Sequence, residues 1–149
     1  MKVFETGSYS TEDIHMTTGA DALNEATILA KKGRRVQLET VIGQDDAGKF
    51  IQAHCNDAGI MVRDACIKKD EKTGMNIVLV EQDGTRSFLT NPHGTLRSLK
   101  VEHIQMPFPE SAKIVCFASI FVFPKIGPDK LVQIFSQAKM QGKIVCADM

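Results

Sequence analysis

The sequence has no excess of charge of either sign, because 18 Lys and Arg residues balance 18 Asp and Glu residues among 149. It therefore lacks the excess of positive charge that is typical of a nucleic-acid-binding chain, and we expect no nucleic-acid partner. Long apolar runs are also missing: the longest, residues 114–123, is interrupted by Ser119 and is about half of the roughly 20 residues that span a bilayer. No signal-peptide pattern opens the chain. These absences predict a cytoplasmic protein without membrane contact.

Metal-ligand spacing is absent as well. The histidines form no cluster, and the cysteines lie far apart without a Cys-x-x-Cys pair: Cys55, Cys66, Cys116 and Cys146. We therefore expect no metal site. The cysteines are interpreted as reduced, buried thiols. A chain of this length can form a hydrophobic core without disulfides or metal ions.

The spacing of apolar residues predicts alternating helices and strands. Helices are expected over residues 22–32, 46–58 and 129–140, with Gly33 and Gly59 as stops. Strands are expected over residues 36–42, 114–123 and 144–147, and an antiparallel hairpin over 76–81 and 85–89 around the Asp-Gly turn at Gly84. The expected fold class is α/β: a mainly parallel, Rossmann-like sheet flanked by helices, with the hairpin as an excursion.

Two features of the C-terminal part complete this prediction. Phe121 and Phe123 continue the apolar run and are expected in the core, although one of them could form an apolar wall of a pocket. The sequence stops directly after the strand at 144–147, where such a sheet should continue. We therefore expect the chain to be truncated.

One motif near the N-terminus carries most of the functional information. From Gly19 the sequence reads GADALNEA; Ala26 lies two residues after Asn24, Gly33 seven after Ala26, and Gly43 ten after Gly33. This pattern resembles the first signature of the PfkB-type carbohydrate kinases, the ribokinase-like sugar and nucleoside kinases. The stretch GQDDAG over residues 43–48 is similar to the Gly-x-Asp-x-x-Gly of that family.

A third region, Thr73-Gly74 followed by DGTRSF from Asp83, resembles the lid strands of these kinases. Three motifs in the family's order cover most of the chain. The resemblance implies a ribokinase-like fold with an α/β core from residues 19–67 and 94–149 and β lid segments from residues 1–18 and 68–93.

The resemblance implies a sugar-binding site at four residues: Gly19, Ala20, Asp21 and Asn24. A sugar presents hydroxyls, which an amide can meet as donor and acceptor while a glycine backbone approaches closely. Structural alternatives remain, because Asn24 could bond its own backbone and Asp21 could cap the following helix. Ala20 departs from the usual second glycine, so if that position has positive φ, the methyl costs roughly 1 kcal/mol or obstructs the sugar.

Two further groups of residues are expected around the site. Gly43, Asp45 and Gly48 are interpreted as a tight turn that supports the pocket rather than a phosphate cradle, because no Lys-Ser or Lys-Thr follows and the acidic residues would repel phosphate. The lid residues implied by the resemblance are Met75, Ile77, Arg86 and Phe88. The hairpin could be an ordinary β-hairpin that projects from the core. If it is a lid, it would exclude water from the bound sugar, and its strands would pair with those of a second copy in a homodimer.

The catalytic part of the family pattern is missing. Phosphoryl transfer needs a base and an anion hole, which the family takes from a DTxGAGD signature that this chain lacks. The string MTTGAD over residues 16–21 belongs to the first signature instead, and Asp13 is interpreted as a surface or turn carboxylate. No residue of this chain is therefore expected to be catalytic, and the ATP and Mg²⁺ that the resemblance implies would bind outside it.

The leading hypothesis is part of an ATP-dependent sugar kinase that phosphorylates a hydroxyl of a small carbohydrate, with this chain supplying the sugar-binding half and the lid. On its own the chain is expected to be inactive. A non-catalytic sugar-binding or dimerising module related to these kinases is the alternative. A dinucleotide-binding domain fits the α/β pattern, but Gly-x-Gly-x-x-Gly is missing after a first strand.

Overall fold

The computed structural model describes residue 7 and residues 10–149 of the chain. Part of the predicted lid segment 1–18 thus lies outside the described residues. The α-helices are α1 (Asp21–Lys31), α2 (Asp46–Ala58) and α3 (Pro128–Met140). The strands are β1 (Val36–Leu38), β2 (Ile42–Gly43), β3 (Ile60–Val62), β4 (Ile67–Lys68), β5 (Asn76–Val80), β6 (Arg86–Thr90), β7 (Ile114–Phe117) and β8 (Ile144–Ala147). Short 3₁₀ turns lie at Asp64–Cys66, Thr95–Arg97 and Val101–His103.

The three helices confirm the prediction from apolar spacing. α2 has the predicted bounds, and α1 and α3 each begin one residue earlier than expected. Gly59 and Gly33 follow α2 and α1 with φ of 73° and 75°, a left-handed conformation that glycine adopts without the penalty of a side chain. None of the described helices is long and apolar enough to cross a bilayer.

The strands confirm the predicted α/β class, but two of them are shorter than expected. The predicted strand 36–42 is divided, because β1 pairs with β3 whereas β2 pairs with β4, both in parallel. The predicted strand 114–123 ends at Phe117, and Ser119 then adopts a φ of 53° that turns the chain. β7 pairs in parallel with β8, which has the predicted bounds.

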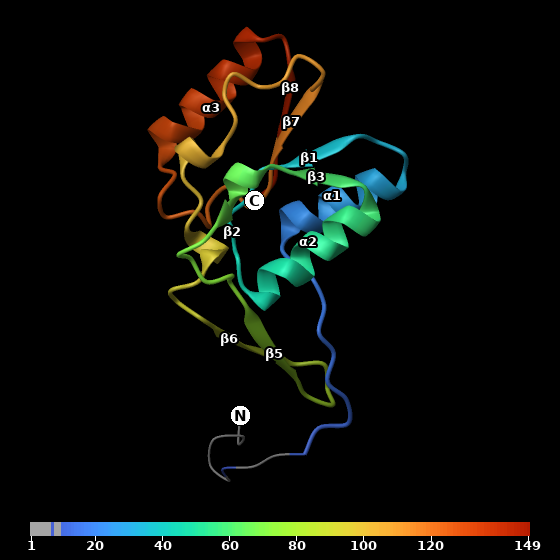
Figure 1. The fold of residues 1–149 in the computed structure, drawn as a ribbon. Helices are drawn as coiled ribbons and strands as arrows, with labels where there is room; N and C mark the ends of the chain where they lie inside the picture. Colours follow the sequence, from blue (N-terminus) through green and yellow to red (C-terminus); the bar gives the residue numbers. More distant parts are fainter. Residues whose placement is uncertain (1–6, 8–9) are drawn as a thin grey trace.

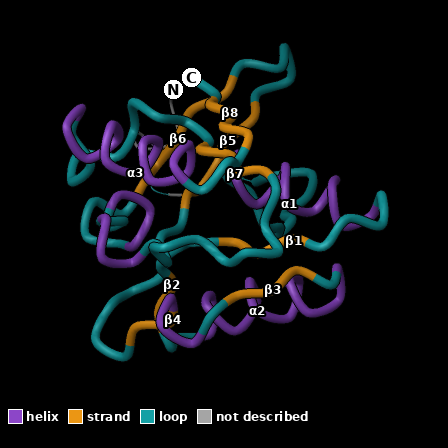
Figure 2. The backbone as a smooth tube through the Cα atoms, turned by 90° about the horizontal axis from the view of Figure 1, so that it is seen from above, coloured by secondary structure: helices purple, strands orange, loops and turns teal. Residues whose placement is uncertain are grey.

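The elements form two packed groups and one projecting hairpin (Figure 1). Helices α1 and α2 lie together against β1 and β3, with Leu23, Ala26, Leu38, Cys55 and Ile60 buried between them. Figure 2 shows α3 beside β7 and β8, where a second core contains Phe117, Ile126 and Ile134. The antiparallel hairpin β5–β6, predicted from its Asp-Gly turn, extends away from the helices.

Some side chains lie elsewhere than the sequence predicts. Cys116 and Cys146 are exposed rather than buried, because they are register partners on the β7–β8 pair, which has no further strand beside it among the described residues. Phe121 is also exposed, at 76%. Phe123 does reach the core, where its ring meets that of Phe117 edge-on at 5.6 Å between centroids.

Candidate functional site

The residues of the predicted sugar site lie in the turn that precedes α1 and in the first turn of that helix. The central residue of the preceding turn, Ala20, has φ 76° and ψ 144°, a region that is almost restricted to glycine and that costs other residues about 1–3 kcal/mol. The carbonyl of Ala20 accepts a hydrogen bond from the backbone amide of Asn24 at 3.0 Å. Position 20 therefore has the positive φ at which a methyl group is costly, and Ala20 carries a strained backbone.

The capping role that the sequence allowed for Asp21 is not observed. The N-cap is Ala20, which offers no side-chain hydrogen bond, and Asp21 is the first helical residue. Its carboxylate instead accepts a hydrogen bond from the hydroxyl of Ser119. Because Ser119 follows strand β7, this contact joins the N-terminus of α1 to the carboxyl end of a parallel strand, the edge where open α/β sheets bind ligands.

Ser119 is a residue of the candidate site that the sequence reasoning missed. In the sequence it is only an interruption of the apolar run, yet it is the second described non-glycine residue with a positive φ, after Ala20. Strained backbone that persists in a folded protein clusters at functional sites. The only local signal in the sequence is a small polar residue at the end of a predicted buried strand.

The two remaining predicted residues face open space. A Cβ atom placed on Gly19 would meet no atom within 4 Å, so the backbone there is accessible. Asn24 is exposed on α1. The alternative in which its amide bonds its own backbone is not observed, because the side chain makes no hydrogen bond to any described residue. Among the described residues Asn24 thus has no hydrogen-bond partner for its side-chain amide, and it lies three positions after Asp21 on α1.

The turn formed by residues 43–48 is held by Asp45. Its carboxylate caps α2 by accepting from the amide of Gly48 at 2.9 Å, and it accepts from the amide of Thr73 at 2.9 Å and from the Thr73 hydroxyl at 2.5 Å. Burial opposes ionisation of Asp45, but the hydrogen bonds from Thr73 and Gly48 together outweigh it and keep its pKa below the ordinary value.

Both glycines of this turn are required by close backbone contacts. A Cβ on Gly43 would lie 2.3 Å from the carbonyl oxygen of Glu71, and a Cβ on Gly48 would lie 2.0 Å from the carbonyl oxygen of Gly43. The amide of Gly43 also donates to the hydroxyl of Thr73 at 2.9 Å. The turn is therefore fastened to the segment that leads into the hairpin.

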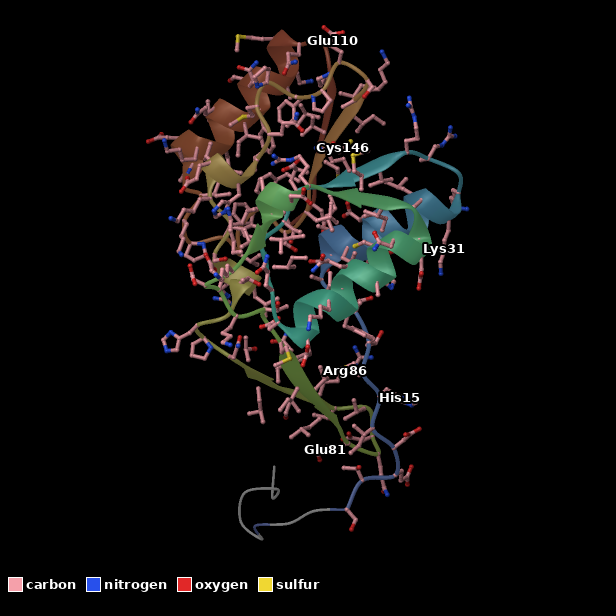
Figure 3. The ribbon with its side chains drawn as sticks, viewed as in Figure 1. His15, Lys31, Glu81, Arg86, Glu110 and Cys146 are labelled. Carbon is pink, nitrogen blue, oxygen red and sulfur yellow. The ribbon has the colours of Figure 1, made fainter. Side chains whose placement is uncertain are left out.

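The predicted lid residues do not share one face of the hairpin. Val78 pairs with Phe88 and Val80 with Arg86, so these four side chains lie on one face, whereas Ile77 and Leu89 lie on the other. Both faces carry exposed apolar side chains; Ile77, Phe88 and Met75, which precedes β5, are 59%, 60% and 57% exposed. Figure 3 shows Arg86 on the hairpin, below α2 and well away from Cys146 on β8. In the described part of the segment 1–18, residues 10–18 form no strand.

Two hollows lie at the base of the hairpin rather than at the predicted sugar residues. One, of about 250 Å³, is lined by residues of the loop after β6, including Asn91, Gly94 and Arg97. The other, of about 380 Å³, combines Arg97 and His93 with Glu71 and Lys125. Gly19, Ala20, Asp21 and Asn24 line neither hollow.

In the part of the chain that the structure covers, no three His, Cys, Asp or Glu side chains converge where they could hold a metal ion. The DTxGAGD stretch is likewise missing from the sequence. The carboxylate of Asp21, the hydroxyl of Ser119 and the carboxamide of Asn24 are groups that can form hydrogen bonds with hydroxyls.

Comparison with known proteins finds one matching family and several similar structures. Residues 3–149 match the family described as pfkB family carbohydrate kinase. Among solved structures, the fructokinase from Xylella fastidiosa superposes with a TM-score of 0.69 at 26% identity over 87% of this chain, and the same fructokinase is also known with bound ATP.

Two further structures share the fold at lower identity. The PfkB protein from Polaromonas sp. JS666 has a TM-score of 0.75 at 22% identity over 92% of this chain. The adenosine kinase from Sinorhizobium meliloti has a TM-score of 0.71 at 20% identity over 85% of it. The chain spans 42%, 47% and 38% of the lengths of the fructokinase, the PfkB protein and the adenosine kinase.

Proposed function

Because the chain belongs to the pfkB family of carbohydrate kinases, we propose that it forms the sugar-binding half and the lid of an ATP-dependent kinase that phosphorylates a hydroxyl of a small carbohydrate. The observation that carries the proposal is the Asp21–Ser119 hydrogen bond, which brings the turn before α1 to the carboxyl end of β7. The accessible backbone of Gly19 lies two positions before Asp21, and the side-chain amide of Asn24 lies three positions after it.

The chemistry of these groups fits a polyol. The carboxylate of Asp21 accepts hydrogen bonds, the hydroxyl of Ser119 can accept because its own hydrogen is donated to Asp21, and the amide of Asn24 both donates and accepts. Three such groups on two rigid elements can fix the position of neighbouring hydroxyls and so orient the acceptor for transfer. ATP supplies the phosphoryl group when it is bound, and the residues of this chain provide acceptor binding and orientation.

The lid is proposed to act through its two apolar faces. One face would cover the bound sugar and exclude water, so that the phosphoryl group is not lost to hydrolysis. The other would pair with the hairpin of a second copy, giving a homodimer. We assign the partner to the face of Val78, Val80 and Phe88, because those side chains are 44%, 64% and 60% exposed, whereas Leu79 on the opposite face is half-buried.

The alternative is a non-catalytic sugar-binding or dimerising module. The exposed apolar side chains on both faces of the hairpin favour it, since a dimerising module needs such surface. The intact mass of the native protein separates the two hypotheses, together with ADP release in a coupled assay of that protein.

The proposed kinase is tested with D-fructose, D-ribose and adenosine. We expect one of them to bind this chain in a calorimetric titration, and the native protein to release ADP with the same compound. Asn24→Ala should weaken binding at least tenfold, because a hydrogen bond to a buried ligand contributes about 1.5 kcal/mol. Asn56→Ala, the same change at an exposed position of α2, is the control. Binding that is unaffected by Asn24→Ala would contradict the site, and an absence of ADP release with every compound would contradict the kinase.

The proposed dimer is tested separately by analytical ultracentrifugation. Phe88→Asp should shift the protein from dimer to monomer, because it places a charge on the proposed partner face. Leu89→Asp introduces the same charge on the opposite face and should leave the dimer intact. A dimer that survives Phe88→Asp, or a wild-type protein that is monomeric, would contradict the assignment.

A further inference from the structure

His54, on helix α2, contacts two threonines that come from different segments. Its Nε2 atom lies 2.9 Å from the hydroxyl oxygen of Thr27 on α1. Its Nδ1 atom lies 3.3 Å from the hydroxyl oxygen of Thr18, in the segment that leads into the predicted sugar site. The imidazole is half-buried between them. A single side chain therefore joins α2 both to α1 and to the chain that precedes it.

The surrounding hydrogen bonds decide which ring nitrogen carries the proton. The hydroxyl of Thr27 donates its only hydrogen to the carbonyl oxygen of Leu23, at 2.7 Å. It must therefore accept from His54, which places a hydrogen on Nε2. In a neutral ring Nδ1 is then an acceptor, and the hydroxyl of Thr18 donates to it. Both nitrogens are used, each in a different role.

Among the described residues 10–19, the Thr18 contact is the one hydrogen bond that reaches a residue outside this segment. Within the described residues 10–19, the other hydrogen bonds join neighbouring residues, as between Ile14 and Asp13 or Thr17 and Thr18. Thr18 lies two positions before Ala20, whose backbone is strained. A strained conformation persists only when its surroundings hold it, and on this side of the turn His54 provides that contact.

We propose that His54 is a positioning residue, which fixes Thr18 and thereby holds residues 19 and 20 in the conformation that presents the sugar-binding groups. The inference deepens the proposed function and rests on it for the identity of the ligand, but the tether itself can be measured without any ligand. The Thr27 bond has a different consequence, since it joins two helices and does not reach the turn.

A simple packing role for His54 predicts a different pattern of mutational effects. If the ring only held α1 against α2, removing the Thr27 hydroxyl would matter and removing the Thr18 hydroxyl would not. If the ring positions the turn, Thr18→Val must change the turn itself. Thr17→Val is the matched control, because the hydroxyl of Thr17 is exposed and reaches only the carbonyl of Thr18, at 3.3 Å.

The first measurement is amide hydrogen exchange of this chain without ligand. The amide of Asn24 bonds the carbonyl of Ala20 at 3.0 Å and reports directly on the turn. Loss of one hydrogen bond should speed its exchange about fivefold in Thr18→Val and in His54→Phe, with no change in Thr17→Val. His54→Gln, which keeps a donor and an acceptor, should restore part of the protection. Exchange at Asn24 that is the same in Thr18→Val as in the wild type would overturn the proposal.

The second measurement is binding of D-fructose, D-ribose or adenosine, whichever the wild type takes. Thr18→Val should weaken it about fivefold and Thr17→Val should not. Unchanged affinity in Thr18→Val overturns the positioning role and leaves the sugar site standing. Faster exchange at Asn24 in Thr18→Val, when the wild type binds none of the three compounds, supports the tether and contradicts the proposed function. Nitrogen-15 shifts that place the neutral-ring proton on Nδ1 would overturn the bonding pattern.

Discussion

Asp45 accepts hydrogen bonds from both the backbone amide and the hydroxyl of Thr73, although the two residues are 28 positions apart. Asp45 also caps α2, and Thr73 lies just before the hairpin. One carboxylate therefore fixes a helix and the base of the proposed lid together. The relationship explains why an acidic residue stands between the glycines of the 43–48 turn, and it leads to the first two predictions.

Removing the Asp45 carboxylate should destabilise the protein. Asp45→Ala loses the cap of α2 and leaves the buried Thr73 hydroxyl without its acceptor, so we expect a loss of about 2–3 kcal/mol in the free energy of unfolding. Asp46→Ala is the control: that side chain is 98% exposed and pairs only with Lys49, and its loss should stay within about 0.5 kcal/mol. Urea unfolding measures both variants. Equal losses of unfolding free energy in the two variants would show that the hydrogen bonds of Asp45 do not stabilise the protein.

The same carboxylate should make stability depend on acid. The pKa of Asp45 is lower in the folded protein than its ordinary value of 3.8, so the folded state binds the proton less readily than the unfolded state. The contribution of Asp45 to the free energy of unfolding is fully present above its ordinary pKa, and it is lost as the pH falls through the lower pKa of the folded state. Asp45→Asn should flatten that part of the stability curve when unfolding is followed from neutral pH to about pH 2. If the stability of Asp45→Asn falls in acid as steeply as that of the wild type, the loss of stability does not come from protonation of Asp45.

Ala20→Gly should stabilise the protein. Glycine adopts the φ of 76° at this position without the strain that alanine carries, and we expect a gain of about 1 kcal/mol after the added entropy of the unfolded chain is counted. The sugar should also bind more tightly if the alanine methyl obstructs it. Ala22→Gly, inside α1, should have the opposite sign and cost about 1 kcal/mol. Thermal unfolding compares the two, and a destabilised Ala20→Gly would refute the prediction.

Glycine substitutions should separate structural from binding roles. Gly48→Ala places a methyl against a backbone carbonyl and should cost about 3 kcal/mol of stability. Gly19→Ala meets open space and should leave the thermal midpoint nearly unchanged while it weakens binding of the sugar. The two variants are compared by calorimetric unfolding and by titration. A large loss of stability in Gly19→Ala would mean that this backbone is packed rather than accessible.

Cys116 should react slowly although it is exposed. Partial burial of the sulfur and the neighbouring Glu25 carboxylate, 3.2 Å away, raise the pKa of Cys116 to about 11, and the thiolate is the reactive form. Iodoacetamide at about pH 8, below that pKa, should therefore modify Cys116 only slowly. Glu25→Gln should speed the reaction several-fold by removing one negative charge. Mass spectrometry of the modified peptide measures the rate, and rapid alkylation of the wild-type residue would contradict both causes of the raised pKa.

Local chemistry was sufficient for the parts of the fold that depend on neighbours in sequence. Apolar spacing and terminal glycines placed α2 between Asp46 and Ala58, and the Asp-Gly pair at Gly84 placed the hairpin. These elements are predictable because their own side chains, turn residues and caps all favour one conformation. The single strand predicted over 36–42 was wrong for a different reason: two halves of it pair with different partners, β3 and β4, and no local pattern shows which strand a neighbour will be.

The candidate site likewise contains features that the sequence predicts and contacts that it does not predict. The spacing of Gly19, Asn24, Gly33 and Gly43 can be read from the sequence, and together with the two motifs that follow it was sufficient to find the family. The sequence also indicated that position 20 could require a positive φ. Ser119 and Thr73 could not be found in this way, because each acts on a residue far from it in sequence, Asp21 and Asp45 respectively.

The sequence by itself therefore determined which backbone positions favour glycine, where the helices lie to within about one residue at each end, and which kind of kinase the chain resembles, because these depend on short-range geometry and residue type. Tertiary structure alone decided which hydroxyl meets Asp21, which threonine completes the Asp45 network, and which threonines His54 joins. Those contacts depend on how separate elements pack, and the strain at Ala20 is tolerated only where such contacts hold the turn on both sides.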